Sequence, residues 1–273
     1  MRREGLQDLL RLLLMDNQEA RRAVGRQVTV WGPEGFVIES RELVEELRCE
    51  IIVNGVHQGV ITCSPWDLED AVTGWLWFRG LIRNGDEITG MEQEGTTFHV
   101  TTRSVSQPCC EAAEACRLTP EEVIALSNEL EEASRLFRRT GGVHTAALAR
   151  DGQLLIRRED VSRHAAVDKA LGACLRQQIP HRGMVLVFSG RVAGEIAQKA
   201  ADMGCAAIIA RSAPTDHACA ITEQAGITLI GFARDDRFNI YTCPQRVTGW
   251  NTSKNPLTLC ELGDFNIYYV IPR

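Results

Sequence analysis

The sequence predicts an α/β protein in which a smaller α+β domain precedes a larger α/β domain. Two observations carry this prediction. In residues 184–232, short apolar runs alternate with amphipathic segments that end in glycine, the pattern of strands joined by helices. In residues 26–104, several strand-like runs accompany a single well-capped helical segment. A chain of 273 residues is long enough to form such a core.

The predicted N-terminal α+β domain spans residues 1–104. Its first segment, 1–24, is expected to be an amphipathic helix, because five leucines recur at helical spacing: Leu6, Leu9, Leu10, Leu13 and Leu14. Asn54-Gly55 has the composition of a tight turn between two strands. Ser64 is the expected N-cap of a helix that ends at Gly80. We expect strands over 28–31, 36–38, 49–53 and 56–62, and two more within 86–104.

Residues 105–140 are predicted to form a cysteine loop followed by a linking helix. Thr119-Pro120-Glu121-Glu122 has the composition of a capped helix start. The apolar face of this helix is expected to hold Val123, Leu126, Leu130, Ala133 and Phe137. Residues 249–273 form a C-terminal extension for which the sequence suggests no role.

The predicted C-terminal α/β domain spans residues 141–248. A hairpin is expected over 143–158, around Asp151-Gly152. Helices are then expected over 160–176, 192–203 and 215–225, alternating with strands over 184–188, 205–210 and 227–232. This alternation predicts right-handed crossovers and a largely parallel sheet core. A hairpin followed by such alternation is typical of nucleoside deaminases, so we expect a cytidine-deaminase-like fold.

Charge is divided unevenly along the chain. The net charge of −6 argues against bulk binding of nucleic acid. Residues 1–133 carry 12 Lys and Arg against 24 Asp and Glu, whereas residues 134–240 carry 15 against 10. The basic part favours an anionic ligand, and uneven solvated surface charge is the alternative. No apolar run reaches the roughly 18 residues of a membrane helix, and the ten cysteines are expected to be reduced thiols in a cytoplasmic protein.

Candidate ligand-binding residues follow the predicted strands and turns. Gly142 and His144 lie at a strand start, where the backbone could approach a ligand or simply turn. Arg163 and Arg191 lie near predicted helix starts, where anions bind. His164 and Asp168 are spaced i, i+4, so they could form a proton-transfer pair or a structural hydrogen bond. No histidine precedes a glutamate by two residues, so zinc-deaminase chemistry and a metal site are not expected.

Six of the ten cysteines fall into two groups, and the other four carry no distinguishing signal. Cys109 and Cys110, with Cys116 nearby, lie in the loop-like segment, where they could be accessible thiols or inert loop residues. Glu111 and Glu114 would oppose thiolate formation there. Apolar helix or strand positions hold three others, which we expect in the core: Cys174, Cys205 and Cys219.

Taken in order, several sequence blocks resemble the formate dehydrogenase accessory sulfurtransferase family (FdhD, also called NarQ). The blocks are Asn54-Gly55, Cys63-Ser64-Pro65, 67–74, 139–144, 159–164, 168–169, 189–191, 212–215, 231–234 and 237–242. The resemblance implies a homodimeric, deaminase-like carrier without zinc. It would accept persulfide sulfur from a cysteine desulfurase and pass it to the molybdenum bis(molybdopterin guanine dinucleotide) cofactor of formate dehydrogenase or a related molybdenum or tungsten oxidoreductase.

The resemblance also assigns roles to residues. The cofactor-binding stretch falls on Phe232-Ala233-Arg234-Asp235-Asp236-Arg237, and GDP is the expected mimic of the bound cofactor. Cys109 is the first choice for the persulfide carrier and Cys110 the second. The family's Cys-Gly-x-Cys-Gly loop is replaced here by Gln107-Pro108-Cys109-Cys110-Glu111. Two alternatives remain open: a cofactor-binding chaperone without sulfur transfer, and an unrelated nucleotide-processing enzyme that uses His164 and Asp168.

Overall fold

The computed structural model describes residues 22–103 and 116–250. Residues 1–21 of the predicted leading helix, Cys109 and Cys110, and residues 251–273 of the C-terminal extension therefore lie outside the described residues. None of the helices within those two ranges has the length and apolar character that a membrane crossing requires.

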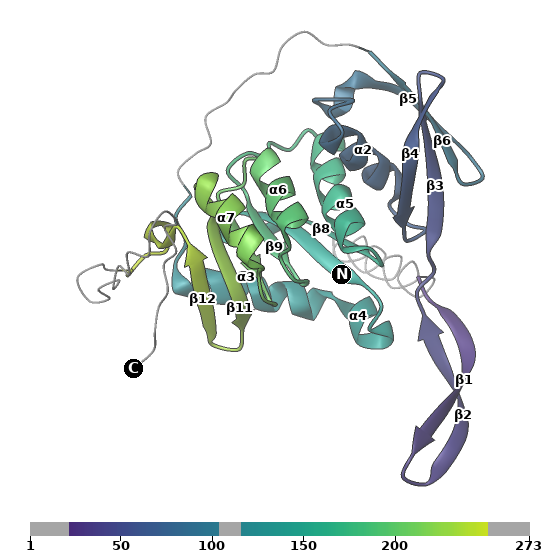
Figure 1. Cartoon of the computed structure of the whole chain (residues 1–273), viewed down its shortest axis with the longest axis horizontal. Helices are drawn as coiled ribbons and strands as arrows, with labels where there is room; N and C mark the ends of the chain where they lie inside the picture. The colour runs from purple at the N-terminus through teal and green to yellow at the C-terminus, as the bar shows by residue number, and fades with distance from the viewer. Residues whose placement is uncertain (1–21, 104–115, 251–273) are drawn as a thin grey trace, which may run out of the picture.

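The N-terminal region combines a projecting hairpin with a four-stranded sheet (Figure 1). The hairpin, here called the arm, consists of β1 (Val24–Gly32) and β2 (Gly35–Leu43), paired antiparallel. The sheet has the order β4-β3-β6-β5, and α2 packs against it through a common apolar core. Its elements are β3 (Leu47–Val53), β4 (Val56–Cys63), α2 (Leu68–Phe78), the short 3-10 helix η1 (Gly85–Glu87), β5 (Ile88–Glu94) and β6 (Thr97–Thr102).

The C-terminal region is built on a six-stranded sheet of order β12-β11-β10-β9-β7-β8. Only the β9–β10 and β10–β11 pairings are parallel, whereas β7, β8 and β12 pair antiparallel. The expected parallel core is therefore confirmed for β9, β10 and β11, and antiparallel hairpins flank it on both sides. The strands are β7 (His144–Arg150), β8 (Gln153–Asp160), β9 (Val185–Phe188), β10 (Ala207–Ala210), β11 (Thr228–Arg234) and β12 (Arg237–Thr242).

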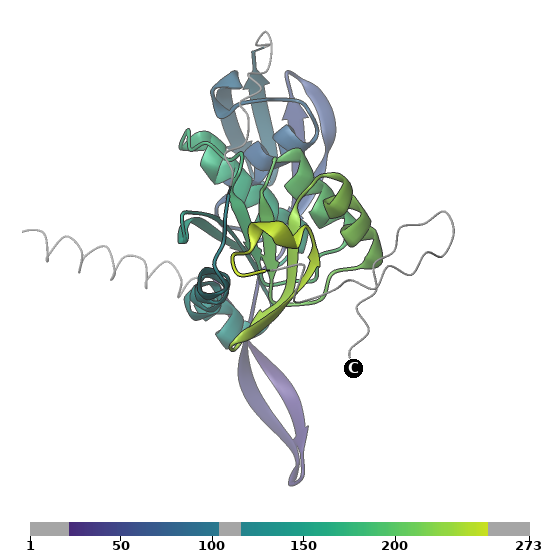
Figure 2. The ribbon, with the colours of Figure 1, turned by 90° about the vertical axis from the view of Figure 1, so that its left-hand side faces the viewer.

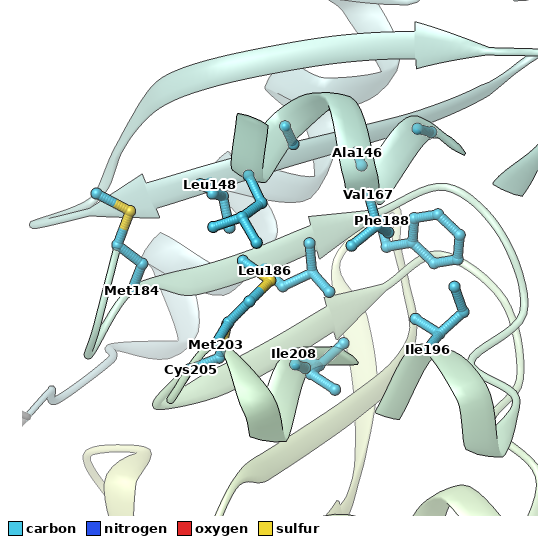
Figure 3. Close-up of a cluster of buried hydrophobic side chains, with 14 of the residues drawn as sticks. Ala146, Leu148, Val167, Met184, Leu186, Phe188, Ile196, Met203, Cys205 and Ile208 are labelled. Carbon is cyan, nitrogen blue, oxygen red and sulfur yellow. The ribbon is translucent and has the colours of Figure 1, made fainter. Parts of the chain in front are cut away.

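Helices cover both faces of this sheet. α5 (Arg163–Arg176), α6 (Gly194–Asp202) and α7 (Asp216–Gln224) pack on one face, against strand residues such as Leu148, Leu186 and Ile208 (Figure 3). α3 (Pro120–Ala133) packs on the other face, against the alternate strand residues such as Val187 and Ile209. The short α4 (Arg135–Thr140) and the 3-10 helix η2 (Pro244–Arg246) complete the described elements. This alternation of buried side chains is what a sheet between two helical layers requires.

Two glycines lie at the contact between helix α2 of the N-terminal region and helix α5 of the C-terminal region. A Cβ atom on Gly74 of α2 would lie 1.9 Å from the carbonyl oxygen of Asp168, and one on Gly172 of α5 would lie 1.9 Å from that of Asp70. The two helix backbones therefore touch, which only residues without a side chain allow. This crossing fixes α2 and its sheet against α5.

Two predicted helices differ from the observed ones. Ser64 is not an N-cap: α2 begins at Leu68, and the Ser64 hydroxyl instead accepts a hydrogen bond from the Val161 N–H at 2.9 Å. Thr119 does cap α3 in a capping box, as expected. However, the helix breaks at Ser134, whose hydroxyl bonds to the Leu130 carbonyl oxygen, so the predicted core residue Phe137 is half exposed.

Candidate functional site

The candidate ligand-binding residues lie along one end of the six-stranded sheet, across the ends of its strands. β8, β9, β10 and β11 end at this edge, and β7 begins there. α5, α6 and α7 begin beside it, because each follows a strand that ends there. Helix N-termini carry partial positive charge and N–H groups without helical partners. We call this rim, which includes Gly142, His144 and Gly190, the binding edge.

At the centre of the binding edge, two rings lie against a glycine. The rings of His144 and Phe188 are stacked, with centroids 6.2 Å apart. A Cβ on Gly190 would lie 3.0 Å from the His144 Nδ1 and 2.9 Å from a Phe188 ring carbon. Burial, and then the Arg163 charge, lowers the pKa of His144. The close approach of these two rings therefore favours glycine at position 190.

Arg163 supplies a buried donor beside these rings. It is the first residue of α5, directly after Ser162, whose hydroxyl caps the helix by accepting from the Ala165 N–H at 3.4 Å. The Arg163 Nε atom is buried and has no hydrogen-bond partner among the described residues. A buried donor without a partner costs about 1–3 kcal/mol. An anionic group bound at this helix N-terminus would supply the missing acceptor.

A β-bulge shapes the next part of the binding edge. The β11–β12 register shifts between Gly231 and Arg234, and Phe232 has a left-handed φ of 53°. Bulges of this kind redirect a side chain, and strained backbone is often found at functional sites. Here the Arg234 guanidinium lies 5.9 Å from the centre of the Phe232 ring. The Ser127 hydroxyl of α3 holds the bulge by donating to the Ala233 carbonyl oxygen at 2.5 Å.

Exposed arginines extend the positive charge along this rim. Arg191, Arg234 and Arg237 are exposed and form no ion pair with any described residue. Asp235 and Asp236 form the turn between Arg234 and Arg237 and are exposed as well. The rim between β8 and β11 spans four strand spacings, or roughly 19 Å at the usual distance between neighbouring strands. The arrangement therefore suits an extended ligand with several negative groups.

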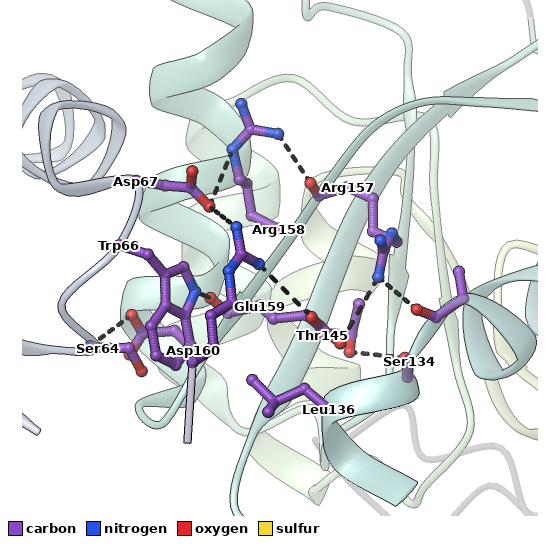
Figure 4. A network of polar contacts seen from close by, with 12 residues as sticks. Ser64, Trp66, Asp67, Ser134, Leu136, Thr145, Arg157, Arg158, Glu159 and Asp160 are labelled. Carbon is purple, nitrogen blue, oxygen red and sulfur yellow. Dashed lines mark hydrogen bonds and ion pairs between the residues drawn. The ribbon is translucent and has the colours of Figure 1, made fainter. Parts of the chain in front are cut away.

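A buried ion pair anchors the same end of the molecule to the N-terminal sheet. Lys169 Nζ lies 2.6 Å from Asp160 Oδ2, and both side chains are inaccessible to solvent. Asp160 also accepts from the backbone N–H groups of Ser64 and Ser162 at 2.9 and 2.7 Å. Burial raises the pKa of Asp160, whereas Lys169 and these two hydrogen bonds act to lower it. Figure 4 shows Ser64 and Trp66 reaching the end of β8. This cluster is structural, because no atom of the ion pair is exposed.

His164 and Asp168 do not form the pair that their spacing allows. The His164 Nε2 lies 3.0 Å from Glu195 Oε2 of α6, and Asp168 instead forms an ion pair with Lys199 of the same helix. Burial lowers the pKa of His164, and burial raises that of Asp168 to about 6. Tertiary contacts between α5 and α6 therefore replace the predicted pairing within α5.

Comparison with known proteins assigns the chain to a family. The model of the FdhD/NarQ family matches residues 93–248. A protein of Staphylococcus haemolyticus named "Sulfur carrier protein FdhD" is 36% identical, over 78% of this chain and 93% of its own length. The chain belongs to the FdhD/NarQ family. A protein of Bacillus pumilus with the same name is 37% identical over the same shares of the two chains.

The family fold is also seen in a solved structure. A crystal structure from Desulfotalea psychrophila, described as that of a formate dehydrogenase accessory protein, superposes with a TM-score of 0.74 at 26% identity. The match covers 82% of this FdhD/NarQ chain and 99% of the other. The mixed α/β architecture is thus shared across most of the chain.

Four of the seven described cysteines of this FdhD/NarQ protein are buried: Cys49, Cys63, Cys174 and Cys205. Cys174 and Cys205 are buried and Cys219 is half-buried against the same core, as expected. Cys116 lines a small cavity with Asp151 and Gly152, the turn at the opposite ends of β7 and β8. Burial raises the pKa of Cys116. Burial likewise raises the pKa of Cys174, Cys205, Cys219 and Cys243, so it opposes thiolate formation at each of these positions.

Three important residues had no role assigned from the sequence. Asp160 and Lys169 belong to blocks that carry the family resemblance, so their ion pair could have been suspected from the order of those blocks. Ser127 gives no such signal, since a serine within an amphipathic helix is ordinary. Its bond to the Ala233 carbonyl joins residues 106 positions apart and exists only in the folded chain.

Proposed function

We propose that this protein is a sulfur carrier of the FdhD type. It takes persulfide sulfur from a cysteine desulfurase and delivers it to the molybdenum bis(molybdopterin guanine dinucleotide) cofactor, which it binds as a substrate for formate dehydrogenase. The family membership supports the sulfur-carrier role. The observation that carries cofactor binding is the buried Nε of Arg163, at a helix N-terminus on the basic binding edge. This atom has no hydrogen-bond partner within residues 22–103 and 116–250.

The residues of the binding edge suit the cofactor's chemistry. Its phosphates need cationic and N–H donors, which Arg163 and the N-termini of three helices provide. Its guanine bases need flat apolar surfaces, and the Phe232 ring at the bulge is such a surface. Arg191, Arg234 and Arg237 lie along the path of an extended dinucleotide. GDP would therefore occupy part of the same site.

Sulfur uptake requires a thiolate that can exchange. The thiolate of Cys109, or else Cys110, attacks the outer sulfur of the desulfurase persulfide, and the desulfurase cysteine leaves as a thiolate. This exchange moves one sulfur atom without net oxidation or reduction. In this proposal the carrier is a homodimer with a cytidine-deaminase-like C-terminal domain. The hairpin β7–β8 followed by β9-α6-β10-α7-β11 supports that fold.

Calorimetric titration with GDP tests the binding edge. Arg163→Gln is expected to weaken binding by about 10- to 100-fold, since a charge-assisted hydrogen bond contributes about 1.5–3 kcal/mol. Arg48→Gln is the matched control, because Arg48 is exposed on β3 of the N-terminal sheet, and it should bind as the wild type does. Equal binding by Arg163→Gln and the wild type would contradict this placement of the site.

Mass spectrometry of the protein after incubation with a cysteine desulfurase and cysteine tests sulfur uptake. Reductant-sensitive added sulfur is expected on the peptide that holds Cys109 and Cys110, and it should be lost in Cys109→Ala/Cys110→Ala. The alternative is a cofactor-binding chaperone without sulfur transfer. The sequence Pro108-Cys109-Cys110 favours this alternative, because it lacks the glycines that flank the cysteines in the family's loop. GDP binding without any added sulfur would select that alternative.

A further inference from the structure

Arg211 differs from the exposed arginines of the binding edge because its side chain is turned into the protein. It directly follows β10 and is only 18% exposed, whereas Arg191, Arg234 and Arg237 are exposed. Its guanidinium reaches α3, which lies on the face of the sheet opposite α6 and α7 (Figures 1 and 2). An arginine engaged in this way is not free to bind a phosphate, so it serves another purpose at this edge.

The guanidinium of Arg211 makes two different contacts with α3. One terminal nitrogen lies 2.6 Å from a carboxylate oxygen of Glu131. The other donates to both the hydroxyl and the carbonyl oxygen of Ser127, each at 3.3 Å. Ser127 and Glu131 are four residues apart, so they lie on the same side of the helix. Arginine can make both contacts at once because its donors form a rigid fork, whereas lysine has a single charged nitrogen.

The hydrogen bond from Arg211 fixes the direction of the Ser127 hydroxyl. A serine hydroxyl has one proton to donate and two lone pairs that accept. Because the Arg211 N–H occupies a lone pair, the proton stays available for the Ala233 carbonyl oxygen, which lies 2.5 Å away. Ser127 and Ala233 are both buried, and hydrogen bonds in a buried chain polarise one another. Arg211 therefore strengthens the bond that holds the β-bulge.

The backbone at Arg211 joins two phenylalanines of the binding edge. The Arg211 N–H donates to the Phe188 carbonyl oxygen at 3.1 Å, and the Phe232 N–H donates to the Ser212 carbonyl oxygen at 3.3 Å. Phe232 has the left-handed φ of the bulge and is half-buried. Strained backbone of this kind persists only where surrounding contacts hold it. Contacts from β10 and from α3 thus hold the bulge on two sides.

We propose that Arg211 is a positioning residue for the base of the bound nucleotide. It acts through Ser127 to fix the bulge, so that the Phe232 ring presents a flat surface on which a guanine base stacks. The inference rests on the proposed function and adds to it a residue that does not touch the cofactor. Phosphates do not depend on the bulge, because Arg163 and the helix N-termini supply their donors.

Arg211→Lys tests this inference because it keeps the positive charge and removes the fork. Calorimetry compares GDP with inorganic pyrophosphate, which has the two phosphates without the base. Arg211→Lys is expected to bind GDP about 10-fold more weakly, because the base loses part of its stacking surface, and to bind pyrophosphate as the wild type does. Arg48→Lys, at an exposed position of β3, is the matched control and should bind both as the wild type does. Circular dichroism verifies that each variant is folded.

Two further measurements show whether Arg211 acts through Ser127. In a double-mutant cycle, the effects of Arg211→Lys and Ser127→Ala on GDP binding should not add, so the double variant should bind about as weakly as Ser127→Ala alone. Hydrogen–deuterium exchange followed by mass spectrometry requires no nucleotide. Exchange in residues 228–242 should be about 5- to 10-fold faster in Arg211→Lys and in Arg211→Met than in the wild type, because the bulge opens more often.

Weaker GDP binding with unchanged pyrophosphate binding, together with faster exchange at the bulge, supports the inference. Equal weakening of GDP and pyrophosphate binding would overturn it, because Arg211 would then bind a phosphate directly. GDP binding at wild-type strength, additive effects in the cycle, or exchange at the wild-type rate in both Arg211 variants would overturn it as well. A wild type that binds no GDP contradicts the proposed function instead, and hydrogen exchange then still decides whether Arg211 holds the bulge.

Discussion

Gly172 of α5 lies where the helix backbone touches α2, and its replacement by alanine has a cost that the structure determines. The new Cβ would lie 1.9 Å from the Asp70 carbonyl oxygen, whereas real Cβ atoms essentially never come closer than 3.0 Å. The opposing atom belongs to the backbone and cannot rotate away. The two helices must therefore separate by about 1 Å, and such overpacking costs about 1–3 kcal/mol.

Separation of the helices also weakens the ion pairs across the crossing. Asp70 of α2 binds Arg158 at 2.8 Å and Arg176 at 2.7 Å. Asp70 is buried, so weakened pairing adds about 1–2 kcal/mol, and the better helix propensity of alanine returns about 1 kcal/mol. We expect Gly172→Ala to lower the free energy of unfolding by about 3 kcal/mol, which corresponds to roughly 6–12 °C in melting temperature.

Urea unfolding followed by circular dichroism measures this loss. Gly90→Ala is the control, since a Cβ there would meet Thr101 atoms at an ordinary 3.8 Å, and it should change stability by less than about 1 kcal/mol. GDP binding should weaken in Gly172→Ala as well, because α5 carries Arg163 at its start. A Gly172→Ala variant as stable as Gly90→Ala would refute the reasoning.

Three further outcomes are expected. Ser127→Ala leaves the buried Ala233 carbonyl without its donor, so unfolding free energy should fall by about 1–3 kcal/mol and calorimetry should show weaker GDP binding. Burial, and then the Arg163 charge, lowers the pKa of His144 in the free protein. The contribution of the neutral His144 ring to the free energy of unfolding is therefore complete above pH 6.5, the usual histidine value, and is lost as the pH falls through and below that value. A bound anion favours the protonated His144 ring, so GDP binding should strengthen as the pH falls from 7.5 to 6. His144→Gln should make GDP binding less dependent on pH. Weaker GDP binding by the wild type at pH 6 than at pH 7.5 would contradict this prediction. Lys169→Met strands the buried Asp160 carboxylate and should cost about 3–5 kcal/mol in urea unfolding, whereas a surface-like loss below 1 kcal/mol would show that the pair is not buried in solution.

Local sequence patterns predicted most of the secondary structure. The capping box at Thr119 and the turn at Asp151-Gly152 lie where expected, because their hydrogen bonds join residues close in sequence. The prediction for Ser64 was wrong because it used only local sequence. Serine before a helix is a common N-cap, but the Ser64 hydroxyl instead accepts a hydrogen bond from the N–H of Val161, far away in the sequence. The edge strand β12, which pairs antiparallel with β11, was not predicted from the sequence.

The candidate site divides in the same way. The sequence by itself determined which residues carry positive charge at strand ends, and the order of the blocks identified the family. Only the tertiary structure decided that Arg163, His144 and Gly190 converge, because β7 and β9 must first pair antiparallel. It also decided that His164 and Asp168 turn to α6 rather than to each other. Spacing along one helix fixes which side chains can meet, whereas burial against a neighbouring helix fixes which of them do.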